Sequence, residues 1–234
     1  MIEQKMPVPI APQTRTLLAC GVLAGPLYIA VTAIQASTRH GFDPTEHRYN
    51  LLTTGDLGWI HRTNYVVAGL VMVLFAVGVG RMLRWGRGAR WAPWLFGVYG
   101  VAYIASGVFP ADPVVGFPPG TVSESTTWHG MAQMASRSAS TAALIAACLV
   151  IAAWFNGQGL RIWAWFSLAA VPLPLIAYGL LGAVGVDKST KYLAFLVPGI
   201  LMWVWVTALA VHLYRRAERH DAAPGPVKQG LRHR

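Results

Sequence analysis

Residues 16–37 read TLLACGVLAGPLYIAVTAIQAS, an apolar run without a single Asp, Glu, Lys or Arg. A helix needs about 20 such residues to cross the hydrocarbon core of a bilayer. In lipid a helix satisfies every backbone N–H and C=O within its own segment. Five further apolar runs follow, at 65–80, 92–109, 135–154, 162–184 and 192–214. The sequence therefore predicts an all-α fold, a polytopic membrane helical bundle of six transmembrane helices.

The charged residues indicate how this bundle is oriented. They make up only 12% of the chain, about half the share usual in soluble proteins, and the net charge is +10. Most basic residues fall in the gap at 81–90 and after Tyr214. Short loops rich in Lys and Arg stay on the cytoplasmic side, so both termini are predicted to be cytoplasmic. Because no basic stripe alternates with aromatic residues, no nucleic-acid partner is predicted; the expected partners are membrane lipids.

The six runs leave little chain outside the membrane. Residues 1–15 are predicted to be a cytoplasmic tail, 16–214 one transmembrane domain, and 215–234 a disordered basic cytoplasmic tail. Cys20 and Cys148 both fall in apolar runs, which favours small buried thiols over a disulfide or a metal pair. The sequence leaves open a homo-oligomer or another membrane protein as partner.

The gaps predicted to face outward are polar and stiff. Asp56, His61 and Asn64 lie in or beside the gap after the first run, and Asp112 and Glu124 lie between the third and fourth. Four prolines in 110–120 restrict the second of these gaps, and two glycines there permit turns. Long loops of this kind often cover a site, so we expect 110–120 to form a lid.

Three polar residues at spacings of four mark the start of the fourth run, namely His129, Gln133 and Arg137. They share one helix face and extend about 12 Å along the axis. An arginine facing lipid at that depth is unfavourable. Two arrangements are open: Arg137 is buried and paired with Asp56, Asp112 or Glu124, or it reaches back to the interface.

The same region holds the candidates for chemistry. His61 and His129 with Asp56 or Asp112 are residue types that hold a catalytic zinc. However, the chain has no HxxxH pair around His129 and no HExxH motif, so neither a metal nor another cofactor is predicted. No GxSxG elbow marks a serine nucleophile.

Several short motifs, in this order, resemble the family known as domain of unknown function 998: Gly41-Phe42-Asp43-Pro44, Gly55-Asp56-Leu57-Gly58-Trp59, Asn64-Tyr65 with Gly69, Phe109-Pro110-Ala111-Asp112-Pro113 and His129-Gly130. The resemblance runs from the first apolar run to the sixth. It implies a prokaryotic six-helix protein of the cytoplasmic membrane without an established activity. The family often has His-Gly-x-x-His, whereas this chain has His129-Gly130 followed by Gln133 at the last position. The family also usually has a tyrosine at the position of Phe42.

The leading functional hypothesis is an outward-facing polar pocket that binds a lipid head group or small amphiphile. Its ligand-binding candidates are Arg137, His129, Gln133, Asn64, His61, Asp56 and Asp112. One alternative is a membrane-embedded lipid hydrolase or transferase with His129 as general base and Asp56 or Asp112 beside it. A further alternative is a small transporter, although no internal repeat is visible.

Overall fold

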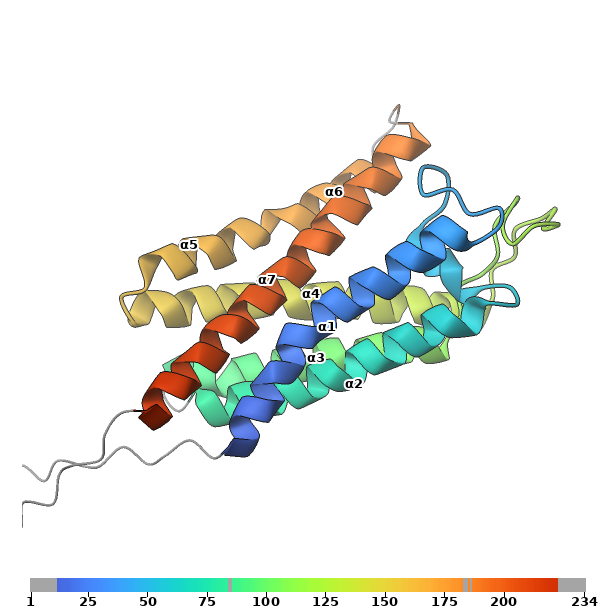
Figure 1. The fold of residues 1–234 in the computed structure, drawn as a ribbon. Coiled ribbons are helices and arrows are strands. Elements are labelled where there is room, and N and C mark those ends of the chain that lie inside the picture. The colour runs from blue at the N-terminus through green and yellow to red at the C-terminus, as the bar shows by residue number, and fades with distance from the viewer. Residues whose placement is uncertain (1–11, 84–85, 183–184, 186, 223–234) are drawn as a thin grey trace, which may run out of the picture.

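The computed structural model describes residues 12–83, 86–182, 185 and 187–222, which form one bundle of helices (Figure 1). Within these ranges the chain has no β-strand. The elements in chain order are α1 (Pro12–Thr38), the short 3-10 helix η1 (Tyr49–Thr53), α2 (Gly58–Met82), α3 (Gly86–Val108), α4 (Trp128–Gly157), α5 (Arg161–Ala170), α6 (Pro172–Gly182) and α7 (Lys188–Ala222). The predicted all-α fold is therefore confirmed.

Among the described residues, four helices are long and apolar enough to cross a membrane: α1, α2, α4 and the Leu196–Arg219 part of α7. The chain is thus a membrane-embedded helical protein in its general architecture. The count of six spans and the cytoplasmic position of both termini stay predictions.

The fifth apolar run is not one continuous helix. It divides into α5 and α6 at Val171, whose N–H bonds the carbonyl oxygen of Leu168 at 3.1 Å. Pro172 has no N–H to continue the ladder of α5, and its fixed φ suits the first position of a new helix. The described part of the run predicted as the fifth span, 162–182, therefore consists of two helices, because the proline starts a second one.

Glycines bring α2 and α3 into backbone contact. A Cβ on Gly69 would lie 2.5 Å from the carbonyl oxygen of Gly100, and a Cβ on Gly100 would lie 2.7 Å from that of Gly69. Neither position has room for a side chain. Such small residues are typical of helix interfaces in membranes, where close packing drives association.

An aromatic cluster fills the bundle between α1, α2, α3 and α7. Its members are Tyr28, Tyr65, Tyr99, Tyr103 and Trp203, all buried. Neighbouring rings lie with their centroids between 4.8 Å and 5.7 Å apart, mostly tilted or edge to face. These separations are those of favourable aromatic pairs. The cluster forms a rigid wall inside the bundle.

Two loop segments, 39–57 and 109–127, together form what we call the loop cap, at the end of the bundle where α1 ends and α2 begins (Figure 1). Buried Leu51, Ala111 and Phe117 form its small core. The prolines of the predicted lid pack against the other segment, Pro118 against Gly55 and Pro119 against Gly41. The segment 110–120 therefore folds onto 39–57.

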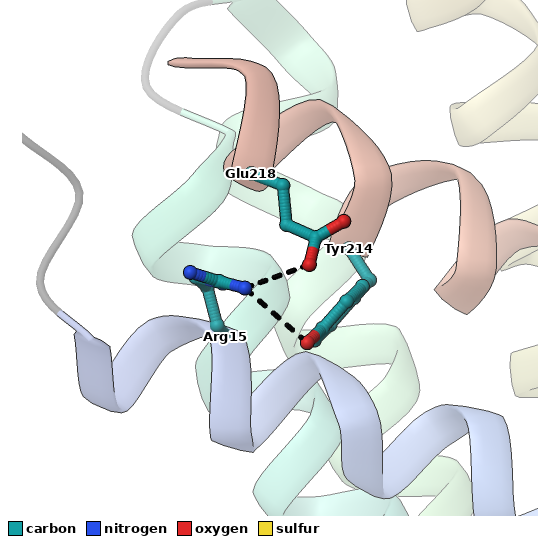
Figure 2. A network of polar contacts seen from close by, with 3 residues as sticks. All are labelled: Arg15, Tyr214 and Glu218. Carbon is teal, nitrogen blue, oxygen red and sulfur yellow. Dashed lines mark hydrogen bonds and ion pairs between the residues drawn. The ribbon is translucent and has the colours of Figure 1, made fainter. Parts of the chain in front are cut away.

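At the opposite end of the bundle, α1 and α7 are joined by polar contacts (Figure 2). Arg15 Nη2 donates to Glu218 Oε1 at 2.7 Å and to the hydroxyl of Tyr214 at 3.4 Å. Helix α7 continues past Tyr214 to Ala222, so the first part of the predicted C-terminal tail is helical. The rest of that tail and residues 1–11 lie outside the described residues.

Candidate functional site

Arg137 points into the bundle from α4. It lies roughly 14 Å along the helix axis from Trp128, at 1.5 Å per residue. Its Nη1 donates to the hydroxyl of Tyr65 at 2.7 Å, and its guanidinium carbon lies 5.5 Å from the centroid of the same ring. Tyr65 is fully buried and belongs to the aromatic cluster. The guanidinium is therefore half-buried and faces a tyrosine inside the bundle.

The predicted carboxylate partners lie elsewhere. Asp112 accepts hydrogen bonds from the backbone N–H of Thr127 at 3.0 Å and from its hydroxyl at 2.5 Å. Asp56 and Glu124 are exposed in the loop cap. Within the described ranges the ion pair is Arg15–Glu218, and none joins Arg137 to these three carboxylates. The hydroxyl of Tyr65 contacts the guanidinium where one of the two interpretations of the sequence placed a carboxylate.

A cavity of about 80 Å³ lies beside Arg137, between α3, α4, α6 and α7. This is room for several water molecules. Its wall combines the guanidinium with aromatic rings and with two prolines: Tyr99, Tyr103, Trp203, Pro174 and Pro198. The cavity thus joins one positive charge to an apolar and aromatic surface in the interior of the bundle.

Two hydroxyls on α4 complete this part of the wall. Ser140 and Thr141 line the cavity, and both donate back to the carbonyl oxygen of Arg137, at 2.7 Å and 3.1 Å. Their hydrogens are used within the helix, so they offer the cavity acceptor lone pairs. The positive charge on the described wall of the cavity is that of Arg137.

Gln133 links the bundle to the loop cap. Its side chain is 1% exposed. The amide oxygen accepts from Asn50 Nδ2 at 3.0 Å, and the amide nitrogen donates to Thr53 Oγ1 at 3.2 Å and to the carbonyl oxygen of Ser106 at 3.4 Å. These bonds join α4 to η1 and α3. Gln133 is not among the described residues that line the cavity.

Asn64 and His61 are buried on the neighbouring face of α2. Asn64 Nδ2 donates to the carbonyl oxygen of Tyr28 at 3.1 Å and to Thr32 Oγ1 at 3.3 Å, which ties α2 to α1. The His61 ring lies edge to face against Tyr65 at 4.8 Å. Within the described part of the chain its two nitrogens have no hydrogen-bond partner. Neither residue is among the described lining of the cavity.

His129 lies at the start of α4, beside the loop cap. It is half-buried and stacks on Trp128 with the ring centroids 3.6 Å apart. A Cβ on Gly130 would lie 2.0 Å from Asp112 Oδ2, so the glycine lets the carboxylate approach the helix start. Asp112 also accepts from Thr127, the N-cap residue of α4. Asp112, Thr127 and Gly130 therefore form one helix-capping arrangement at the start of α4. Across the described ranges, no three His, Cys, Asp or Glu side chains are grouped to hold a metal ion.

Sequence reasoning singled out Arg137 but missed the residues around it. Tyr65, Tyr99, Tyr103 and Trp203 lie inside apolar runs, where an aromatic residue is usually assigned to packing. A signal was present, because a buried tyrosine hydroxyl normally requires a partner. Several tyrosines in the apolar interior, opposite a single arginine, are consistent with the pairing that the structure contains.

The family model described as "Protein of unknown function (DUF998)" matches residues 22–212, which is most of the chain. No curated protein and no solved structure matches the sequence. The matched range begins within α1 and ends within α7, so it includes the loop cap, the Arg137 cavity and the helices that form them.

Proposed function

The chain belongs to the DUF998 family, which is defined without an assigned function, and we propose that it binds an anionic amphiphile in the membrane. The acidic group of this ligand lies at Arg137 in the cavity between α3, α4, α6 and α7. We place the protein in the cytoplasmic membrane of a prokaryote, as its motifs imply.

The observation that carries this proposal is the cation on the wall of an aromatic cavity. A charged side chain within a membrane span is unfavourable, and such residues usually mark a functional site. The fully buried hydroxyl of Tyr65 accepts from Arg137 Nη1 and so fixes the guanidinium, a planar fork of N–H donors, within the bundle. The planar fork is suited to phosphate and carboxylate oxygens.

The polar ligand set expected from the sequence is reduced by these contacts. Gln133 and Asn64 are engaged in bonds between helices, and Asp112 accepts from Thr127, the N-cap residue of α4. We therefore assign the ligand contact to Arg137, with Tyr99, Tyr103 and Trp203 against the apolar part of the ligand.

The alternative functions find less support in the contacts. A hydrolase or transferase would need His129 oriented by a carboxylate, and the hydrogen bonds of the described residues join Asp112 to Thr127. Asp56 is exposed in the loop cap. A transporter stays a prediction from the sequence, as do a homo-oligomer and a membrane protein partner.

Native mass spectrometry of the protein purified in mild detergent tests the proposal. Wild-type protein should retain an amphiphile that dissociates as an anion, and Arg137→Gln should lose it. Tyr65→Phe is the matched variant, because it removes the hydroxyl at 2.7 Å and keeps the cation. We expect Tyr65→Phe to retain the ligand.

A second arginine serves as the control for charge. Arg90 is exposed and lies over the ring of Trp91 at 5.4 Å, outside the described cavity lining. Arg90→Gln should keep the ligand. If Arg137→Gln folds to the same helical content and retains the same ligand mass in the same amount, the proposal is wrong.

A further inference from the structure

A second cavity, much larger than the first, lies between α4 and α5 near the turn that joins them. Its volume is about 540 Å³, which is within the range of ligand pockets. The wall on α4 consists of Leu149, Ala152, Ala153 and Asn156. These positions share one face of the helix, because they lie three, four and seven residues apart.

The wall on α5 has the same spacing in the opposite direction. It consists of Arg161, Ala164, Trp165 and Leu168. The two polar residues, Asn156 and Arg161, therefore lie together at the turn, and the apolar residues extend away from it on both walls. Alanines at 152 and 164 are buried, so small side chains form the floor of this groove. Trp165, 70% exposed, forms part of its rim.

We infer that this groove binds an anionic membrane lipid, with the phosphate at Arg161 and Asn156 and an acyl chain along the apolar walls. A free phosphate would leave the apolar walls without contacts, and an uncharged chain would leave the arginine without an anionic partner. The polar end and the apolar length of the groove match the two parts of one phospholipid. Arg161 supplies charge-assisted hydrogen bonds to phosphate oxygens.

The charge around the turn favours the same occupant. Arg216 of α7 donates to Gln158 Oε1 at 3.2 Å and lies over the ring of Trp154 at 5.2 Å, which places a second cation beside the α4–α5 turn. Arg215 and Arg219 are exposed on the same end of α7. Each basic residue near a membrane surface attracts anionic lipid by about 1 kcal/mol. This end of the bundle therefore concentrates anionic lipid around the groove.

The groove and the Arg137 cavity are different sites. They share α4 but no described residue, and the groove is lined from the part of α4 that follows Leu144. The proposed lipid at Arg161 does not depend on the amphiphile proposed at Arg137. Each site is therefore tested by its own substitutions.

The test is a native mass spectrometry titration of the full chain in detergent with phosphatidylglycerol. Phosphatidylcholine is the zwitterionic comparison, and glycerol phosphate is the head group alone. Wild type should bind one phosphatidylglycerol, and Arg161→Gln should weaken this binding about tenfold, the loss of one charge-assisted contact. Arg161→Lys should retain most of it.

Ala153→Phe tests the apolar part of the groove. Ala153 is exposed, so the larger ring fills the groove without disturbing the core. We expect this variant to lose the bound phosphatidylglycerol. Ala33→Phe on the exposed face of α1 and Arg90→Gln are the matched controls and should bind as wild type does.

Three results would overturn the inference. The first is binding of phosphatidylglycerol by Arg161→Gln and Ala153→Phe at wild-type affinity. The second is binding of glycerol phosphate as tight as that of the lipid, which would identify a free phosphate as the ligand. The third is a lipid-free dimer of wild type that Ala153→Phe converts to monomer, which would make the groove an interface between two copies. Arg161→Gln should keep the ligand that Arg137→Gln loses, so failure of either site is seen separately.

Discussion

Replacing Gln133 by leucine should destabilise the fold while leaving ligand binding in place. The side chain is 1% exposed, and its amide makes three hydrogen bonds that join α4 to η1 and α3. Leucine is of similar size, so the change removes the polar contacts without opening a large cavity.

The magnitude follows from the individual bonds. The bonds with Asn50 at 3.0 Å and Thr53 at 3.2 Å are well formed, and the one with Ser106 at 3.4 Å is weak. Each well-formed bond contributes about 1 kcal/mol net. Thr53 Oγ1 keeps two other partners, because it accepts from the N–H of Ala111 and donates to the carbonyl oxygen of Asn50. We therefore expect a loss of about 2 kcal/mol, with little added penalty for orphaned groups.

The assay is equilibrium unfolding in mixed micelles of mild detergent and sodium dodecyl sulfate, followed by tryptophan fluorescence. Gln13→Leu is the control, because Gln13 is exposed at the start of α1. Gln133→His should lose less than Gln133→Leu, since a neutral imidazole has one donor and one acceptor and keeps two of the bonds. If Gln133→Leu is as stable as the control but no longer retains the amphiphile, Gln133 is a ligand residue and our assignment is wrong.

Three further changes test other parts of the structure. Gly130→Ala should lower the free energy of unfolding by about 1–2 kcal/mol, because the added Cβ displaces Asp112 from Thr127, the N-cap residue of α4. If this free energy falls no more than it does in Ala33→Gly in the same micelle assay, the capping role is contradicted. Glu218→Gln should change the unfolding midpoint less than Gln133→Leu does, because both partners of its ion pair with Arg15 are more than a third exposed; a larger shift would show that this pair holds α1 and α7 together. Hydrogen bonds from Ser189 and Thr190 lower the pKa of Asp187 below its usual 3.8, so the ionised carboxylate stabilises the fold above about pH 4, and this stabilisation is lost as the pH falls through the pKa of the folded state. Between pH 5 and pH 3 the unfolding midpoint should therefore fall less in Asp187→Asn than in wild type. Equal pH dependence of the two midpoints would refute the linkage.

The general architecture could be predicted because it depends on long apolar runs, and such runs leave few alternatives in lipid. The break at Pro172 was less predictable. Pro26, Pro93 and Pro198 remain inside continuous helices, whereas Pro172 begins a new one. A proline in an apolar run indicates a lost hydrogen bond, and the packing of neighbouring helices decides whether the helix bends or ends there.

The candidate site could be predicted only in part, because side-chain partners are set by tertiary packing. The spacing of His129, Gln133 and Arg137 correctly indicated a shared helix face. However, these three residues have different neighbours: the indole of Trp128, the loop cap and the hydroxyl of Tyr65. The sequence contains no signal for which of them reaches the cavity, because that depends on how far α6 and α7 lie from α4 at each level of the bundle.

The contact between Gly69 and Gly100 has a consequence for the order in which the protein assembles after synthesis. Inserted helices find one another in lipid through close packing, since burial of apolar surface provides no driving force there. Helices α2 and α3 follow one another closely in the chain and already carry complementary glycines, so their hairpin is able to form before α4 has left the insertion machinery. The loop cap requires residues 109–127 and can close only afterwards. Helix α7, which packs on α1, follows the other described helices in the chain, so the Arg137 cavity is completed only once α7 has entered the membrane.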